Sequence, residues 1–255
     1  MTKEFLPNIL EQKEKEVDRL EMEALQPLRS TYKLYDFLKS HSDKLQLVAE
    51  VKKASPSLGD INLDVDIIEQ AKVYEKNDAA MISVLTDQIF FKGDIDFLRQ
   101  ISNQVTIPTL AKDFIIDEKQ IVRSRNAGAT VILLIVAALS PQRLKELFDF
   151  ATGLGLEVLV ETHNQSELDI AHRIGAQIIG VNNRNLVTFE VDINTSLSLS
   201  TQFQSDCVYI SESGIFTGGD AKLLSPFFNA ILVGTALMTA DNVAEKVEEL
   251  RIDKS

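Results

Sequence analysis

Short apolar runs and amphipathic segments alternate along most of this chain. The runs, rich in Val, Ile and Leu, are LQLVAEVK (45–52), AAMISVL (79–85), TIPTLAKD (106–113), ATVILLIV (129–136), LEVLVE (156–161), AQIIGVN (176–182), CVYIS (207–211) and NAILVG (229–234). Runs of this length and composition predict buried strands, and the segments between them, such as 65–77, 140–154 and 164–175, have the spacing of amphipathic helices. Strands that alternate with helices predict a parallel sheet.

Eight such units in 255 residues predict a single α/β domain, a closed (β/α)8 barrel of the TIM type. Helix-end signals agree, because Ser140 and Pro141 form a typical helix start and Gly175 stands where a helix should end. The alternative is an open doubly wound sheet, but no G-x-G-x-x-G follows the first predicted strand. We therefore expect a barrel over 45–255, preceded by an extension over 1–44.

The N-terminal extension should be helical. Apolar residues recur near helical spacing among many charges, which predicts a helix over 8–25, and a second, short helix is expected over 31–40. The first residues contain no apolar segment of the kind found in signal peptides. The longest apolar run, 129–139, is far shorter than the roughly 20 residues that span a bilayer.

Charge and cysteine content narrow the class of protein. The net charge is -12 and the pI is about 4.8, so the chain should repel phosphate backbones, and we expect no nucleic-acid partner. A single cysteine, Cys207, excludes an intramolecular disulfide and fits a reducing compartment. We expect a cytoplasmic protein without membrane association, either a monomer or a weak homo-oligomer.

Polar side chains gather at the C-terminal ends of the predicted strands. Glu50 and Lys52 share one face of the first strand, while Lys112 ends the third and Glu161 ends the fifth. Further polar residues at strand ends are Asn182, Arg184, Glu212 and Ser213. Singly, each fits a solvated loop residue or a helix cap. Together they predict a functional site, because active sites of such barrels lie at this end and buried charges are costly unless paired or used.

Small residues follow the last two strands. Ser213 and Gly214 come after the seventh strand, and Gly234 and Thr235 after the eighth. Loops at these two positions form the recurring phosphate site of this fold, and glycine lets backbone N–H groups approach an anion closely. We therefore expect a small, anionic, phosphorylated ligand.

Other kinds of chemistry have no support in the sequence. The three histidines lack metal-ligand spacing and H-E-x-x-H is absent, so we expect no metal. Ser55 and Ser57 have no evident His partner, which argues against a nucleophilic serine. Cys207 opens the seventh predicted strand at its N-terminal end, away from the expected site, and is interpreted as a small core residue.

Several segments resemble the indole-3-glycerol-phosphate synthase family of tryptophan biosynthesis. They are AEVKKASPSLG, LTDQIFFKG, AKDF, LVETHN, IGVNNRNL, SESGI and ILVGTALM, and the match runs in order through essentially the whole chain. In that family a helical N-terminal extension lies over the barrel mouth. The family converts 1-(2-carboxyphenylamino)-1-deoxyribulose 5-phosphate to indole-3-glycerol phosphate, releasing carbon dioxide and water, and uses no metal and no organic cofactor.

The resemblance implies roles for the site residues. Lys112 is similar to the acid that stabilises the alkoxide during ring closure, Lys52 to the dehydration acid and Glu161 to the base, with Glu50 positioning the lysines. The residues alone leave open which lysine serves which step. Substrate binding would fall to Ser55, Phe91, Phe114, Asn182, Arg184, Leu186 and Glu212. We expect the apolar wall around the aryl ring to lower the lysine pKa values toward useful acid strength.

Two departures and two alternative functions remain. The chain has Leu58 where similar proteins often carry a cation, and Asn185, in place of Asp, could loosen Arg184. One alternative is a phosphoribosyl isomerase on the same barrel, which would need a Cys–Asp pair at strand ends, and Cys207 stands at the wrong end. The other is a non-catalytic phosphate-binding barrel, which would need the phosphate loops but not two acids and a base.

Overall fold

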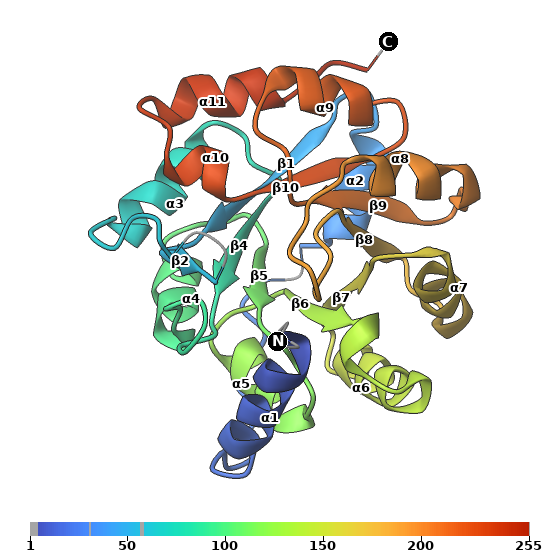
Figure 1. The fold of residues 1–255 in the computed structure, drawn as a ribbon. Coiled ribbons are helices and arrows are strands. Elements are labelled where there is room, and N and C mark those ends of the chain that lie inside the picture. Colours follow the sequence, from blue (N-terminus) through green and yellow to red (C-terminus); the bar gives the residue numbers. More distant parts are fainter. Residues whose placement is uncertain (1–4, 31, 57–58, 255) are drawn as a thin grey trace.

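A closed barrel of eight parallel strands forms the centre of the molecule (Figure 1), which confirms the predicted fold class. The computed structural model describes residues 5–30, 32–56 and 59–254. The barrel strands are β1 (Gln46–Val51), β4 (Met81–Leu85), β5 (Thr109–Lys112), β6 (Val131–Ile135), β7 (Glu157–Thr162), β8 (Ile178–Asn182), β9 (Val208–Glu212) and β10 (Ala230–Val233). Each lies within or overlaps one of the predicted apolar runs, and β1 closes the barrel by pairing with both β4 and β10.

Helices surround the strands and cover their outer faces (Figure 1). They are α3 (Ile67–Lys76), α4 (Ile95–Ser102), α5 (Glu118–Asn126), α6 (Pro141–Gly153), α7 (Gln165–Ile174), α8 (Asn194–Leu199), α9 (Gly218–Leu224), α10 (Thr235–Met238) and α11 (Val243–Leu250), with 3₁₀ turns η1 (Val136–Ala138) and η2 (Ser200–Gln202). The predicted helix ends at Ser140 and Gly175 are confirmed. The Ser140 side chain accepts the Arg143 N–H at the start of α6, and Gly175 ends α7 in the left-handed conformation.

Strand side chains alternate between two apolar cores. On β1, Leu47 and Ala49 pack outward against the helices, whereas Val48 faces the barrel interior. Glu50 shares the inward face of Val48 and is 4% exposed. The barrel interior on the N-terminal side of Glu50 is apolar, so the charged groups at the C-terminal strand ends lie directly above an apolar core.

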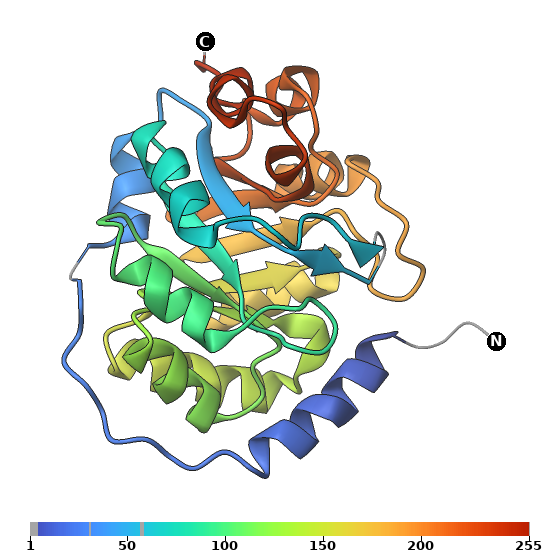
Figure 2. The ribbon, with the colours of Figure 1, turned by 90° about the vertical axis from the view of Figure 1, so that its left-hand side faces the viewer.

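The N-terminal extension divides between the two ends of the barrel (Figure 2). Helix α1 (Phe5–Val17) lies by the C-terminal ends of the strands, and α2 (Leu34–Ser40) covers the opposite end, where Leu34 and Leu38 join the inner core. The strap (residues 18–30) runs along the outside between them. The assignment of the whole chain to one domain, with an extension over 1–44 and a barrel over 45–255, stays a prediction.

The expected helix over 8–25 is therefore wrong beyond Val17. The strap is extended because its backbone bonds to the end of α5 instead of to itself: Gln26 N–H donates to Asn126 Oδ1, and Asn126 Nδ2 donates to the Ala24 carbonyl. The second helix begins at Leu34, after Tyr32 and Lys33, and residue 31 of the expected range lies outside the described residues. A short hairpin, β2 (Ala54–Ser55) with β3 (Gly59–Asp60), occupies the loop after β1 and was not predicted.

Candidate active site

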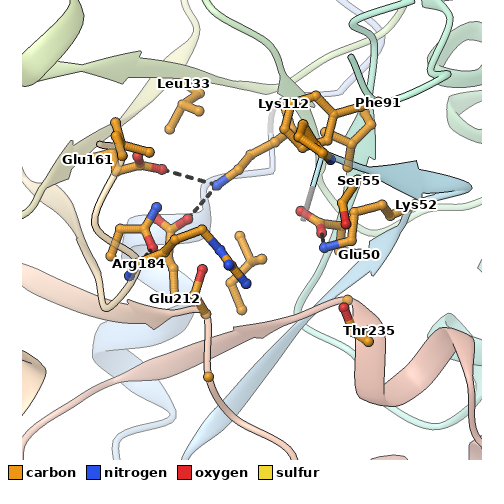
Figure 3. A pocket seen from close by; sticks show the side chains of 18 of the residues that line it. Glu50, Lys52, Ser55, Phe91, Lys112, Leu133, Glu161, Arg184, Glu212 and Thr235 are labelled. Carbon is orange, nitrogen blue, oxygen red and sulfur yellow. Dashed lines mark hydrogen bonds and ion pairs between the residues drawn. The ribbon is translucent and has the colours of Figure 1, made fainter. Parts of the chain in front are cut away.

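All the predicted site residues line one pocket at the C-terminal ends of the barrel strands, with a volume of about 1040 Å³, its open mouth included. They are Glu50, Lys52, Ser55, Phe91, Lys112, Phe114, Glu161, Asn182, Arg184, Leu186, Glu212, Ser213, Gly214, Gly234 and Thr235. Figure 3 shows two separate charged groups in it, Lys112 with Glu161 and Glu212, and Lys52 with Glu50. The structure thus brings the predicted residues together, while their roles stay predictions.

The first charged group stands at the end of β1. Lys52 Nζ lies 2.8 Å from Glu50 Oε1, and Ser83 Oγ on β4 donates to Glu50 Oε2 at 3.4 Å. Gly234 leaves room for this pair, because a Cβ there would lie 2.4 Å from Glu50 Oε1 and 3.0 Å from Lys52 Nζ. A glycine that sequence reasoning assigned to the phosphate site therefore also makes space for the ion pair.

The second charged group joins three strands. Lys112 Nζ at the end of β5 lies 3.3 Å from Glu161 Oε2 on β7 and donates a hydrogen bond to Glu212 Oε2 on β9. Gly180 leaves space for Glu212, since a Cβ there would lie 2.2 Å from Glu212 Oε1. One ammonium is thus shared by two carboxylates that are almost completely buried.

Charge sharing decides the protonation of this group. Burial alone would lower the pKa of Lys112, but Glu212 and Glu161 outweigh it and raise that pKa above its usual range. The expected lowering of lysine pKa values is therefore wrong for Lys112. Burial raises the pKa of Glu161, yet Lys112 and His163 reverse this and hold it well below its usual range. Burial and the Glu161 charge together raise the pKa of Glu212 to about 7, against the effect of Lys112.

The loop after β8 positions the arginine. Arg184 N–H donates to Asn182 Oδ1 at 3.0 Å, and Arg184 Nη1 donates to the Phe189 carbonyl at 3.1 Å. Asn185 Oδ1 accepts the N–H groups of Val187 and Thr188, so it forms the turn that carries Phe189 back toward Arg184. The departure at Asn185 thus retains a turn-forming side chain. Ser57 and Leu58, the site of the other departure, lie outside the described residues.

Aromatic side chains wall one part of the pocket. The rings of Phe91 and Phe114 lie 6.2 Å apart, and Leu186 belongs to the same apolar cluster. Sequence reasoning missed two further rings that line the pocket: Phe5 from α1 and Phe189 from the loop after β8, whose centroids are 4.5 Å apart. Neither follows a strand directly, so strand-end position gave no signal for them.

The expected phosphate loop has an unusual backbone. Ser213 and Gly214 have φ values of 67° and 77°, both in the left-handed region. A buried side chain outside the prediction supports them: Asn183 Nδ2 donates to the Ser213 carbonyl at 3.0 Å and to Ser211 Oγ at 3.1 Å. Asn183 is next to the predicted Asn182 but points to the other side of the strand end, which is why its role was not evident.

A buried lysine of α1 joins the helix to the pocket wall. Lys13 Nζ lies 2.8 Å from Asp87 Oδ2, in the loop after β4, and 2.8 Å from Asp113 Oδ1, which directly follows β5. It also lies 2.9 Å from Glu16 Oε2 on its own helix. Burial would lower the pKa of Lys13, but the two aspartates raise it above its usual range. Asp87 accepts the N–H of Phe91 at 3.1 Å, and Asp113 accepts that of Phe114 at 2.8 Å. The cation therefore connects α1 to the two loops that carry the aromatic wall.

The described residues contain neither a metal-binding cluster nor a membrane-spanning helix. Within 5–30, 32–56 and 59–254, no group of three or more His, Cys, Asp or Glu side chains could hold a metal ion. None of the helices formed by those residues is long and apolar enough to cross a membrane.

Comparison with known proteins identifies the family. A family model described as indole-3-glycerol phosphate synthase matches residues 6–250. Proteins named indole-3-glycerol phosphate synthase from Streptococcus mutans and Streptococcus thermophilus are 79% and 78% identical over 254 residues, and one from Streptococcus pneumoniae is 69% identical, with full coverage of both chains in each case. A crystal structure of 3-hexulose-6-phosphate synthase from Salmonella typhimurium shares the fold, with a TM-score of 0.66 at 13% identity, covering 81% of this chain and 96% of that one. The chain therefore belongs to the indole-3-glycerol phosphate synthase family, and its activity is that of a carboxy-lyase of tryptophan biosynthesis.

Proposed function

We propose that the pocket converts 1-(2-carboxyphenylamino)-1-deoxyribulose 5-phosphate to indole-3-glycerol phosphate, and that Lys112 is the acid of ring closure. The observation that carries this proposal is the grouping of Lys112, Lys52 and their carboxylate partners in one pocket beside an aromatic wall. A sensor of phosphate would not need these two lysine–carboxylate groups. An isomerase with a Cys–Asp pair is disfavoured, because Cys207 precedes β9 at its N-terminal end.

Ring closure needs an acid at the ketone. The aryl carbon that bears the carboxylate attacks the ketone carbon, and the carbonyl oxygen takes a proton from Lys112 to become a hydroxyl. Loss of carbon dioxide leaves its bonding electrons with the ring and restores the aromatic system. Lys112 suits the first step because Glu161 and Glu212 keep it charged at a place where its side chain is only 14% exposed, and an ammonium there stabilises a developing alkoxide strongly.

Dehydration needs an acid and a base. Lys52 protonates the leaving hydroxyl, which departs as water, and Glu161 takes the proton released as the indole forms. Glu50 lies 2.8 Å from Lys52 Nζ and holds that ammonium in place. The position of Glu161 supports its role as the base, since it is 2% exposed at the end of β7 and lines the pocket.

The remaining residues would hold the substrate by its three chemical parts. The phosphate lies at Ser213 and Gly214, together with Gly234 and the first residue of α10, Thr235. The aryl ring packs against the aromatic wall. The substrate carboxylate and hydroxyls meet a polar set: Ser55, Asn182, Arg184 and Glu212. We further expect a cytoplasmic protein, a monomer or weak homo-oligomer, with no nucleic-acid or membrane partner.

A turnover assay tests the proposal. Purified protein mixed with the carboxyphenylamino sugar phosphate, with a chelator present, should give indole fluorescence. Lys112→Ala should lower kcat by about 10²–10⁴, the range for loss of a general acid. The control is Lys145→Ala, at an exposed lysine paired with Asp149 on α6, which should leave kcat unchanged. Binding without turnover by the wild-type protein would favour the non-catalytic alternative, and near-normal kcat in Lys112→Ala would remove Lys112 from the mechanism.

A further inference from the structure

We propose that His163 is a positioning residue for this reaction, which holds the Glu161 oxygen that Lys112 does not contact and keeps that carboxylate ionised. The inference rests on the proposed role of Glu161 as the base of dehydration. His163 is not one of the described residues that line the pocket, so it would act on the reaction only through Glu161.

Glu161 lies between two cationic groups. Its Oε2 is 3.3 Å from Lys112 Nζ, and its Oε1 is 3.3 Å from His163 Nε2. The imidazole is partly buried, with a side chain that is 12% exposed, and its buried Nε2 has no aligned hydrogen-bond partner among the described residues. The carboxylate of Glu161 is therefore the group that this buried N–H can face.

The far side of the imidazole is fixed by α7. His163 Nδ1 lies 2.9 Å from Glu167 Oε2, and the backbone N–H of His163 donates to the same oxygen. Asn164 Nδ2 donates to Glu167 Oε1 at 2.7 Å, while Asn164 Oδ1 accepts the Glu167 N–H as the cap of α7. The ring is thus fixed at Nδ1 by Glu167, with Nε2 facing Glu161 Oε1 at 3.3 Å, and it cannot turn away from Glu161 without breaking the contact with Glu167.

A ring with a carboxylate at each nitrogen favours the doubly protonated, charged form. Burial lowers the pKa of His163, but Glu161 and Glu167 outweigh it and raise that pKa to about 10. The other ionisable groups facing Glu161 are Lys112 from β5 and, through that lysine, Glu212 from β9. His163 is therefore a cation at neutral pH.

This second cation matters when the first one reacts. Once Lys112 gives its proton to the substrate in ring closure, it no longer supplies a positive charge to Glu161. His163 still does, so Glu161 stays ionised and aimed for the dehydration that follows. The order of the two steps thus gives a reason for two cations on one base.

The kinetic test compares His163→Gln with wild type across pH. Loss of the cation raises the pKa of Glu161, so the acidic limb of the kcat profile should move up by about 1–3 pH units, the usual effect of one nearby opposite charge. Activity should recover toward neutral pH and KM should stay the same. The control is His172→Gln, on α7 and hydrogen-bonded to Tyr209, which should leave the profile unchanged. An equal fractional loss at every pH, or a changed KM with unchanged kcat, would overturn the inference.

NMR gives a second readout that needs no substrate. The chain has three histidines, so His41→Gln and His172→Gln assign the His163 imidazole signals by elimination, even if the His163 variant does not fold. Those signals should be those of a charged ring at pH 8, and Glu161→Gln should lower the pH at which the ring loses its proton. A neutral His163 ring at pH 8 would refute the pairing. If the wild-type protein shows no turnover, the proposed function fails, and the NMR result alone decides whether His163 and Glu161 form an ion pair.

Discussion

Replacing Lys13 by Met removes the cation from a buried group of charges that joins α1 to the barrel. The Lys13 side chain is 2% exposed, and its three partners, Asp87, Asp113 and Glu16, are 0%, 15% and 32% exposed. Methionine fills a similar volume with an apolar chain, so the main effect is to leave the two less exposed carboxylates, Asp87 and Asp113, without their cation. The free energy of unfolding should fall as a result.

The size of this effect follows from what the carboxylates keep. Removal of one partner from a buried ion pair costs about 3–5 kcal/mol. Asp87 retains the N–H groups of Phe90 and Phe91, and Asp113 retains that of Phe114, so we expect the lower end, about 3 kcal/mol. In a chain of this size each kcal/mol changes Tm by about 2–4 °C, which gives a decrease of about 6–12 °C.

The assay is urea unfolding and thermal melting followed by circular dichroism. The control is Lys15→Met on the same helix, because Lys15 is 55% exposed and its pair with Glu11 is screened by water, so little or no loss of stability is expected. Adding Asp87→Asn to Lys13→Met should recover part of the loss, since it removes one unpaired charge. Equal losses for Lys13→Met and Lys15→Met would refute the reasoning.

Two further predictions concern the charged groups of the pocket. Gly234→Ala should displace the Glu50–Lys52 pair, because the new Cβ would lie 2.4 Å from Glu50 Oε1, and a displacement of about 1 Å costs roughly 10²-fold in kcat. Kinetics and thermal melting would be compared with those of Gly153→Ala, where a Cβ meets nothing within 4 Å. A kcat of Gly234→Ala within about twofold of wild type would count against the prediction. Glu212→Gln should become more stable relative to wild type as pH rises. The pKa of Glu212 is about 7 in the folded protein and 4.5 in the unfolded chain, so binding of its proton stabilises the folded wild-type protein. That contribution to the free energy of unfolding is full below pH 4.5 and is lost as pH rises through 7. Urea unfolding between pH 4.5 and 8 checks this, and parallel curves for the two proteins would contradict it.

Local pattern was enough to predict the barrel and much of the candidate site. Period-two alternation fixed the face of Glu50 and Lys52, and the rule that barrel sites lie at C-terminal strand ends brought in Lys112 and Glu161 from distant segments. These inferences need only neighbours in sequence and a known strand direction, which is why they hold in the structure.

The parts that were missed depend on pairs far apart in sequence. The sign of the Lys112 pKa change depends on Glu212, a hundred residues away, and burial alone gave the wrong direction. Lys13 stands at helical spacing from the buried Ile9 and Val17, but its partner Asp87 becomes visible only in the fold. The helix stops at Val17 because a distant side chain, Asn126, bonds the strap that follows.

The strap gives the chain an asymmetric tolerance to changes of length. It connects α1, which Lys13 fixes near the pocket, to α2, which Leu34 and Leu38 fix at the other end of the barrel (Figure 2). An inserted residue can bulge into solvent at little cost, because the entropy of a surface loop grows slowly with its length. A deletion shortens the strap, so α1 or α2 would have to give up its contacts with the barrel. Natural variation in this segment should therefore favour insertions over deletions.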